Sequence, residues 1–210
     1  MSIIGAKLAA VAGASLLATR QVVPNDGKWV FPVHAWRGYA PTRSHEYNAD
    51  NHHGVDLMFV RKPGGADSMW PSGLTRMNGI AKSYGDAKGK FFMPDRIYAC
   101  AARDGTIWEC TKSPRGLQIV VDHGRPFATY YQHLSSALFP LGITKGAQGI
   151  AVKAGQPLGV IGFDTSGLDR QYLMHLHFEV WFNGNWTAHV DPWPLLERAP
   201  LPPVPEGVPT

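Results

Sequence analysis

Short apolar runs bounded by glycine, aspartate or asparagine dominate the pattern of hydrophobic and polar positions along the chain. The clearest runs are "GLQIVVDH", "RPFATYYQHL", "QPLGVIGF" and "HLHFEVWF". In the second run, the two-residue period of a strand places Thr129, Tyr131 and His133 on one face. After residue 20, no apolar period of the helical kind persists over three turns. The pattern therefore predicts a domain made mainly of antiparallel β-strands.

A hairpin is predicted around Arg103-Asp104-Gly105, because Asp-Gly between two β-rich runs is a strong hairpin signal. The flanking runs are "RIYACAA" and "TIWEC". Cys100 and Cys110, the only cysteines, then lie on its two arms. Two interpretations remain open: a disulfide across the hairpin, or two small buried thiols.

The domain itself is expected to cover residues 28–198, with a distinct segment at each end. Residues 1–27 are an apolar N-terminal segment, and the uninterrupted apolar run within it has only 11 residues, too few to span a bilayer comfortably. This segment suits an anchor, a docking helix or a signal-like peptide. Residues 199–210 are proline-dense, which predicts an extended tail outside the core.

Composition narrows the class of protein. A chain of 210 residues with 44% hydrophobic residues is long enough for one substantial domain with its own core. The 23 glycines and 17 prolines indicate many turns and few long helices. The net charge is +4, but lysine and arginine are spread without a run, which argues against a nucleic-acid partner.

Histidines supply the candidate chemistry, with nine in the chain. In "NHHGVDL", His52 and Asp56 flank a glycine turn that can fold both side chains towards one point. On a strand, His175 and His177 share a face about 7 Å apart, so one can bind a metal while the other reaches the metal's water. Ligands from His, Asp and His with an open fourth position are typical of a catalytic zinc site. The remaining histidines need no function, although His53 competes with His52: His34, His45, His53, His123 and His189.

Six motifs match, in order, the pattern of a known family. They are "HHGVD" (52–56), "IYACAARDGTIWE" (97–109), "IVVDHGRPFATYYQHLS" (119–135), "VKAGQPLGVIG" (152–162), "HLHFEV" (175–180) and "VDPWPLL" (190–196). Over most of Phe31 to Leu196, the chain resembles the lysostaphin-type, or LytM-like, zinc endopeptidases of peptidoglycan. The resemblance implies antiparallel β-sheets that form an open groove, a fold of the barrel-sandwich hybrid type.

The resemblance also implies the residues of the site. His52, Asp56 and His177 correspond to the zinc ligands, and His133 and His175 to the catalytic histidines. Zinc lowers the pKa of its water and polarises a carbonyl, and a neighbouring histidine moves protons. The implied function is a zinc-dependent peptidoglycan endopeptidase in an extracytoplasmic location. The alternative is a catalytically silent wall-binding or regulatory module of the same fold, although this sequence keeps every ligand.

The chain departs from the family pattern most clearly in the 40 residues 57–96, where the family has a short connection. We expect this insertion to form a loop or lobe that borders the substrate groove. A smaller insertion, "ALFPLGITKGAQG", follows His133, and "QYLM" precedes His175 where the family favours Gly-Pro.

The expected partners follow from the same interpretation. Peptidoglycan peptides are the implied substrate, and no nucleic acid is expected. The apolar N-terminal segment suits docking to a membrane or to a larger assembly such as a phage particle.

Overall fold

The computed structural model describes residues 25–60, 91–94, 96–146, 148–163 and 174–208. Strands dominate this part of the chain, with a single four-residue helix, α1. The elements are β1 (Pro41–His45), β2 (Val55–Val60), β3 (Phe91–Phe92), β4 (Tyr98–Cys100), β5 (Gly105–Ser113), β6 (Gly116–Asp122), β7 (Phe127–Ala137), β8 (Ile150–Val152), β9 (Pro157–Ile161), β10 (Leu176–Phe182), β11 (Asn185–Val190) and α1 (Trp193–Leu196). Every ladder between them is antiparallel, which confirms the predicted fold class. No helix among the described residues is both long and apolar enough to cross a membrane.

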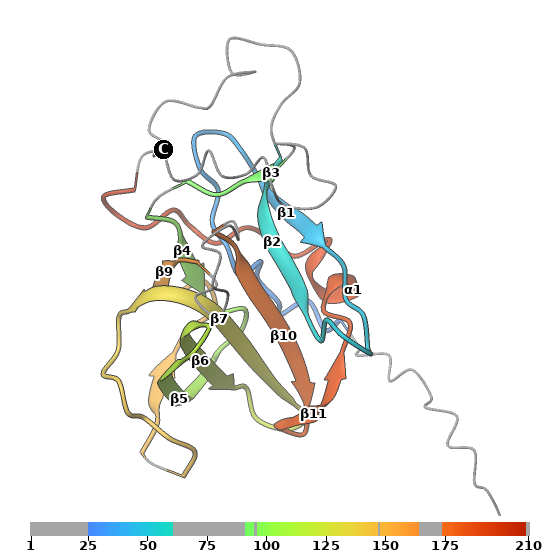
Figure 1. Ribbon diagram of the computed structural model, residues 1–210, viewed down its shortest axis with the longest axis vertical. Helices are drawn as coiled ribbons and strands as arrows, with labels where there is room; N and C mark the ends of the chain where they lie inside the picture. The colour runs from blue at the N-terminus through green and yellow to red at the C-terminus, as the bar shows by residue number, and fades with distance from the viewer. Residues whose placement is uncertain (1–24, 61–90, 95, 147, 164–173, 209–210) are drawn as a thin grey trace, which may run out of the picture.

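The strands form one open sheet in the order β1-β2-β10-β7-β6-β5-β8. β3 pairs with β2, β11 with β10, and β9 with both β4 and β7. Figure 1 shows β10 in the middle of the fold, between β2 and β7. This central position matters because β10 carries the HxH motif.

One face of β2 and β10 belongs to the core, and the other carries Asp56 on β2 and His177 and Glu179 on β10. Val55 and Leu57 are fully buried on either side of Asp56 along β2, and Leu176 and Phe178 are fully buried on either side of the β10 histidine. Each such apolar side chain contributes roughly 1.5 to 3 kcal/mol when buried. The core therefore fixes which way the intervening polar side chains point.

The hairpin predicted around Asp104-Gly105 is not formed. β4 pairs with β9, while β5 pairs with β6 and β8. Asp104 instead ties the chain to a distant turn, because its carboxylate accepts hydrogen bonds from Lys153 Nζ at 2.9 Å and from the Ala154 backbone N–H at 2.8 Å. Non-local strand pairing has overridden a local turn signal.

The two cysteines are free and fully buried, which decides between the two interpretations in favour of buried thiols. They lie on strands that do not pair with each other, Cys100 on β4 and Cys110 on β5. Burial raises the pKa of Cys100 to about 12. Both therefore behave as small apolar side chains.

The proline-rich segment packs against the domain over its described residues, 199–208. The carbonyl of Pro200 accepts a hydrogen bond of 2.9 Å from the Phe31 N–H, and Val208 joins the hydrophobic core. The expectation that the tail stays outside the core is wrong for Val208, whereas most of the other described residues of the tail are exposed or half-buried. Proline lacks an N–H donor, but its carbonyl and apolar ring still pair and pack.

The long insertion begins later than the sequence suggested, because residues 57–60 continue β2. The chain returns through β3, where Phe91 pairs with Val60 and Phe92 with Phe59. Four residues of strand, about 13 Å, separate Asp56 from Val60. Residues 1–24 and 61–90 lie outside the described residues. The expectations for the N-terminal segment and for the body of the insertion therefore stay predictions.

Candidate metal centre and active site

Backbone pairing places four polar side chains in one row across β1, β2, β10 and β7. Asp56 lies opposite His45 on β1 and opposite His177 on β10, and His177 lies opposite Gln132 on β7. Residues directly opposite in an antiparallel ladder point to the same face. The row therefore follows from the register of the three ladders.

Asp56 is the centre of this row, with a side chain only 3% exposed. Its Oδ1 lies 3.0 Å from His52 Nε2, 3.0 Å from His177 Nδ1 and 3.6 Å from His175 Nε2, and its Oδ2 lies 3.3 Å from His45 Nδ1. Burial alone raises the pKa of this carboxyl, but the charge of His175 and hydrogen bonds from His177, His45 and His52 hold it well below its usual value. Asp56 is therefore an ionised acceptor surrounded by imidazoles.

The loop before β2 orients His52. Two backbone hydrogen bonds join Asn48 and His52, and His52 Nδ1 donates to the Glu46 carbonyl at 2.6 Å. Since a carbonyl only accepts, Nδ1 carries the proton and Nε2 is the nitrogen that faces the carboxylate. The glycine of the motif is a packing requirement, because a Cβ on Gly54 would lie 2.3 Å from the Phe178 carbonyl oxygen.

His177 is fixed through both ring nitrogens. Nδ1 faces Asp56, and Nε2 lies 2.9 Å from Glu179 Oε1. Trp181 Nε1 donates to the other oxygen of Glu179 at 2.6 Å. Burial lowers the pKa of His177, but the two carboxylates outweigh it and raise that pKa to about 9. A carboxylate on the second nitrogen is the usual support of a metal-binding histidine.

Glu179 was missed by the sequence reasoning. It stands two residues after His177 on β10, and the two-residue period of a strand places both side chains on one face. That spacing was the available signal.

His133 reaches the site through an unusual backbone conformation, with φ of 66°. Its ring lies 4.6 Å, centroid to centroid, from that of His175, and its Nδ1 donates to the Arg115 carbonyl at 2.8 Å. The expectation that it shares a face with Thr129 and Tyr131 is wrong, because those two residues hydrogen-bond to each other and Tyr131 is fully buried in the core. The left-handed φ turns the His133 side chain away from them.

Gly162, just after β9, links the two histidines through their backbones. Its N–H donates to the His133 carbonyl at 2.6 Å, and its own carbonyl accepts from the His175 N–H at 3.3 Å. These bonds hold His133 next to His175, whose ring borders the carboxylate of Asp56.

The donor set suits a zinc ion. Ligand atoms around tetrahedral zinc lie about 3.3 to 3.5 Å apart, and His52 Nε2 and His177 Nδ1 each lie 3.0 Å from Asp56 Oδ1. Among the described residues, the group whose ligand atoms all lie within 4.8 Å of one another is a different one: His45, His52 and Asp56. We favour His177 over His45, because the His45 side chain is 54% exposed whereas His177 is buried and supported by a carboxylate.

Residues 90–192 match the sequence profile of peptidase family M23. This segment belongs to family M23. The match confirms the resemblance to lysostaphin-type, LytM-like peptidases. The M23 segment contains His133, His175 and His177, whereas His52 and Asp56 precede it along the chain. The structure nevertheless brings His52, His175 and His177 around the Asp56 carboxylate, with the His133 ring beside that of His175.

Solved structures provide a second comparison. A candidate glycyl-glycine endopeptidase, lytM, from Ruminococcus gnavus superposes with a TM-score of 0.50 at 19% identity, over 83% of this chain and 64% of that one. The lysostaphin catalytic domain from Staphylococcus simulans superposes with a TM-score of 0.46 at 22% identity, over 78% of this chain and 98% of that one. A candidate M23 peptidase from Pseudomonas aeruginosa superposes with a TM-score of 0.49 at 19% identity. The superposition covers 83% of this chain and 53% of that one. The Ruminococcus gnavus structure shares the fold, and this chain spans about half of the Pseudomonas aeruginosa structure. No curated protein sequence matches the chain.

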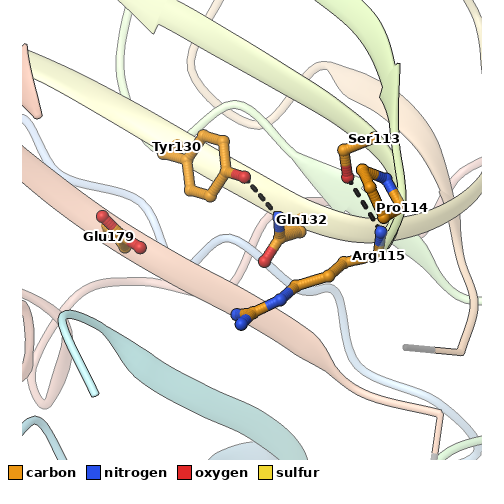
Figure 2. A pocket seen from close by; sticks show the side chains of 6 residues that line it. All are labelled: Ser113, Pro114, Arg115, Tyr130, Gln132 and Glu179. Atoms are coloured by element: carbon orange, nitrogen blue, oxygen red, sulfur yellow. Dashed lines mark hydrogen bonds between the residues drawn. The ribbon is translucent and has the colours of Figure 1, made fainter. Parts of the chain in front are cut away.

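A cavity of about 320 Å³ opens next to the histidines of the M23 segment. It is lined by Ser113, Pro114, Arg115, Tyr130, Gln132 and Glu179. Figure 2 shows the Arg115 side chain extending towards the side of the cavity on which Glu179 lies. Because Glu179 holds His177 and the Arg115 carbonyl holds His133, the cavity adjoins the candidate metal centre.

Proposed function

We propose that the chain is a zinc-dependent endopeptidase that hydrolyses peptide bonds of peptidoglycan. The observation that carries the proposal is the pair of imidazole nitrogens, from His52 and His177, that lie 3.0 Å from one buried carboxylate oxygen of Asp56. Membership of the matched segment in family M23 supports peptidase chemistry.

In this proposal, His52, Asp56 and His177 hold the zinc ion. Bound zinc supplies Lewis acidity, which polarises the scissile carbonyl and lowers the pKa of water. The three protein groups are held before any metal binds, since Glu46, Glu179 and the ladder between β2 and β10 fix their orientation.

His175 and His133 are the proposed proton carriers. His175 is 5% exposed, and its Nε2 lies 3.6 Å from Asp56 Oδ1, so this nitrogen borders the ligand set. His133 donates through Nδ1 to a backbone carbonyl, which leaves Nε2 as its reactive nitrogen. One imidazole takes a proton from the attacking water, and the other donates a proton to the nitrogen of the leaving amine.

The proposed location is extracytoplasmic, because peptidoglycan lies outside the cytoplasmic membrane. The proposed docking of the N-terminal segment to a membrane or a phage particle concerns residues 1–24, outside those the structure describes.

Digestion of purified peptidoglycan by the zinc-loaded full-length chain tests the function. We expect new amino and carboxyl termini, identified by mass spectrometry, and none with His175→Ala or after chelation. Zinc binding together with wall binding but no new termini would instead establish the silent wall-binding module.

A further inference from the structure

The cavity beside the candidate metal centre contains an unpaired cation. Arg115 lies at the tip of the β5–β6 hairpin, where Ser113 Oγ donates to the Gly116 carbonyl at 2.9 Å and accepts from the Arg115 N–H at 3.1 Å. The backbone at Arg115 is therefore fixed. Its guanidinium has no ion pair or hydrogen bond with any residue that the structure describes.

Glu179, the only acid among the described residues that line this cavity, is already paired. Its Oε1 bonds to His177 Nε2 and its Oε2 accepts from Trp181 Nε1. Each carboxylate oxygen already has one partner, and the charge of Glu179 is shared with His177, which reduces what Glu179 offers to a second cation. The uncompensated charge that faces the cavity is the guanidinium of Arg115.

A chain of hydrogen bonds along the sheet fixes the orientation of the Gln132 amide. Gln118 Nε2 donates to the Glu109 carboxylate at 2.6 Å, and the Tyr130 hydroxyl donates to Gln118 Oε1 at 2.9 Å. A carboxylate only accepts, so every donor in the chain points towards Glu109. The Tyr130 oxygen must then accept from Gln132 Nε2.

This polarity leaves Gln132 Oε1 as an acceptor at the cavity. No described residue donates to that oxygen, although the Gln132 side chain is only 7% exposed. The cavity therefore presents one cationic fork of N–H donors and one carbonyl acceptor (Figure 2). Arginine binds carboxylates in a bidentate manner, and charge-assisted bonds of this kind are the stronger ones.

We propose that Arg115 and Gln132 form a substrate subsite, in which Arg115 binds a free carboxylate of the peptide and Gln132 Oε1 accepts an N–H beside it. The inference rests on the proposed function for the identity of the ligand as a wall peptide. It makes this enzyme selective for peptides that carry a free carboxylate next to the scissile bond.

The test uses muropeptides that differ in one group. The peptide carboxylate is free in one form, converted to a carboxamide in the second, and coupled to ethylenediamine in the third, which replaces the anion by an ammonium. Binding is measured by calorimetry on the zinc-loaded chain carrying His175→Ala, and hydrolysis on the zinc-loaded chain with the natural sequence. We expect the carboxylate form to bind roughly tenfold more tightly than the carboxamide.

Variants separate the charge from the fold. We expect Arg115→Gln to remove the difference in binding affinity between the carboxylate and carboxamide muropeptides, and Arg115→Lys to retain part of that difference. Arg125→Gln, the same change on the exposed β6–β7 turn, leaves it intact. Gln132→Glu replaces the acceptor with an anion and weakens binding of the carboxylate form.

The outcomes distinguish the two proposals. Equal binding of all three muropeptides, tighter binding of the ammonium form, or a carboxylate preference that survives Arg115→Gln would overturn the subsite, even if hydrolysis proceeds. A preference that depends on Arg115 without any hydrolysis would overturn the proposed endopeptidase and leave the subsite standing.

Discussion

His133 and Gln132 are consecutive residues of β7, yet both lie beside His177 of β10. Gln132 is the ladder partner of His177, and the His133 ring lies 5.9 Å from the His177 ring, centroid to centroid. Consecutive side chains of a regular strand point to opposite faces. The φ of 66° at His133 removes that alternation, and such a conformation costs roughly 1 to 3 kcal/mol outside glycine. One strand thereby supplies both a proposed proton carrier and a cavity residue.

Substitution of the two proposed proton carriers tests their role. Asparagine tolerates a left-handed backbone, so His133→Asn keeps the local conformation. We expect His133→Asn and His175→Ala to retain zinc and to lose turnover by roughly 10² to 10⁴-fold, the usual contribution of a positioned acid or base. The measurement is kcat on muropeptides, alongside the metal content of each variant.

Ser135→Ala is the matched control for these variants. Ser135 lies two residues after His133 on β7 and donates only to the Val160 carbonyl, so its loss leaves turnover unchanged. Near-normal kcat in His133→Asn or His175→Ala would remove that histidine from the mechanism. Loss of zinc from His175→Ala would make it a ligand instead.

The zinc ligands are tested by metal analysis and chelator competition. We expect about one zinc per chain, with bonds near 2.0 to 2.2 Å. Alanine at His52, Asp56 or His177 removes stoichiometric zinc, because three protein ligands leave no redundancy. His45→Ala retains it, because the exposed His45 stacks on the His52 ring and faces the second oxygen of Asp56, not the oxygen shared by His52 and His177. Retention in His177→Ala with loss in His45→Ala would show that the compact His45, His52 and Asp56 group is the true ligand set.

Glu179 is predicted to act on zinc through His177. Glu179→Gln keeps the shape of the side chain but removes the charge from its hydrogen bond to His177 Nε2. Loss of such a supporting carboxylate weakens metal affinity by roughly 10 to 100-fold, measured as the zinc dissociation constant. Glu197→Gln is the control, since this exposed side chain lies at the C-cap of α1. An unchanged dissociation constant in Glu179→Gln would contradict the prediction.

His123 is predicted to make the zinc-free protein sensitive to acid. Burial lowers the pKa of His123 from 6.5 to about 4, against the opposing hydrogen bond to the Asp104 carbonyl. Its folded pKa lies below its unfolded one, so the stability it contributes is present above pH 6.5 and is lost as the pH falls through about 4. The free energy of unfolding falls by roughly 3 kcal/mol at most through this titration.

Denaturant unfolding of the chelated protein measures this effect between pH 7 and pH 4. His123→Gln removes the contribution of this histidine to the pH dependence of stability. The unfolding free energy of the variant therefore falls less steeply with acid than that of the natural sequence. Parallel curves for the two proteins would show that His123 titrates alike in the folded and unfolded chains.

Local sequence patterns were sufficient to predict the fold class and most strands. The alternation in "HLHFEVWF" reflects one buried and one polar face, whereas "GLQIVVDH" contains a continuous apolar run with Ile119, Val120 and Val121 all buried, and both patterns are properties of the strand itself. The same period places His177 and Glu179 on one face of β10, and His175 directly precedes that strand. The candidate site residues were recognisable because each stands in a short motif.

Tertiary structure decided what depends on partners far away in sequence. Asp104-Gly105 has the local chemistry of a hairpin, yet β4 pairs with β9 because strand pairing is chosen by the whole sheet. His45 reaches Asp56 only through the register between β1 and β2. His133 faces the site only because distant contacts hold its left-handed φ, and no two-residue period signals that conformation. Arg115 likewise acquires a role from the cavity in which the folded hairpin places it, since a surface arginine carries no such information in the sequence alone.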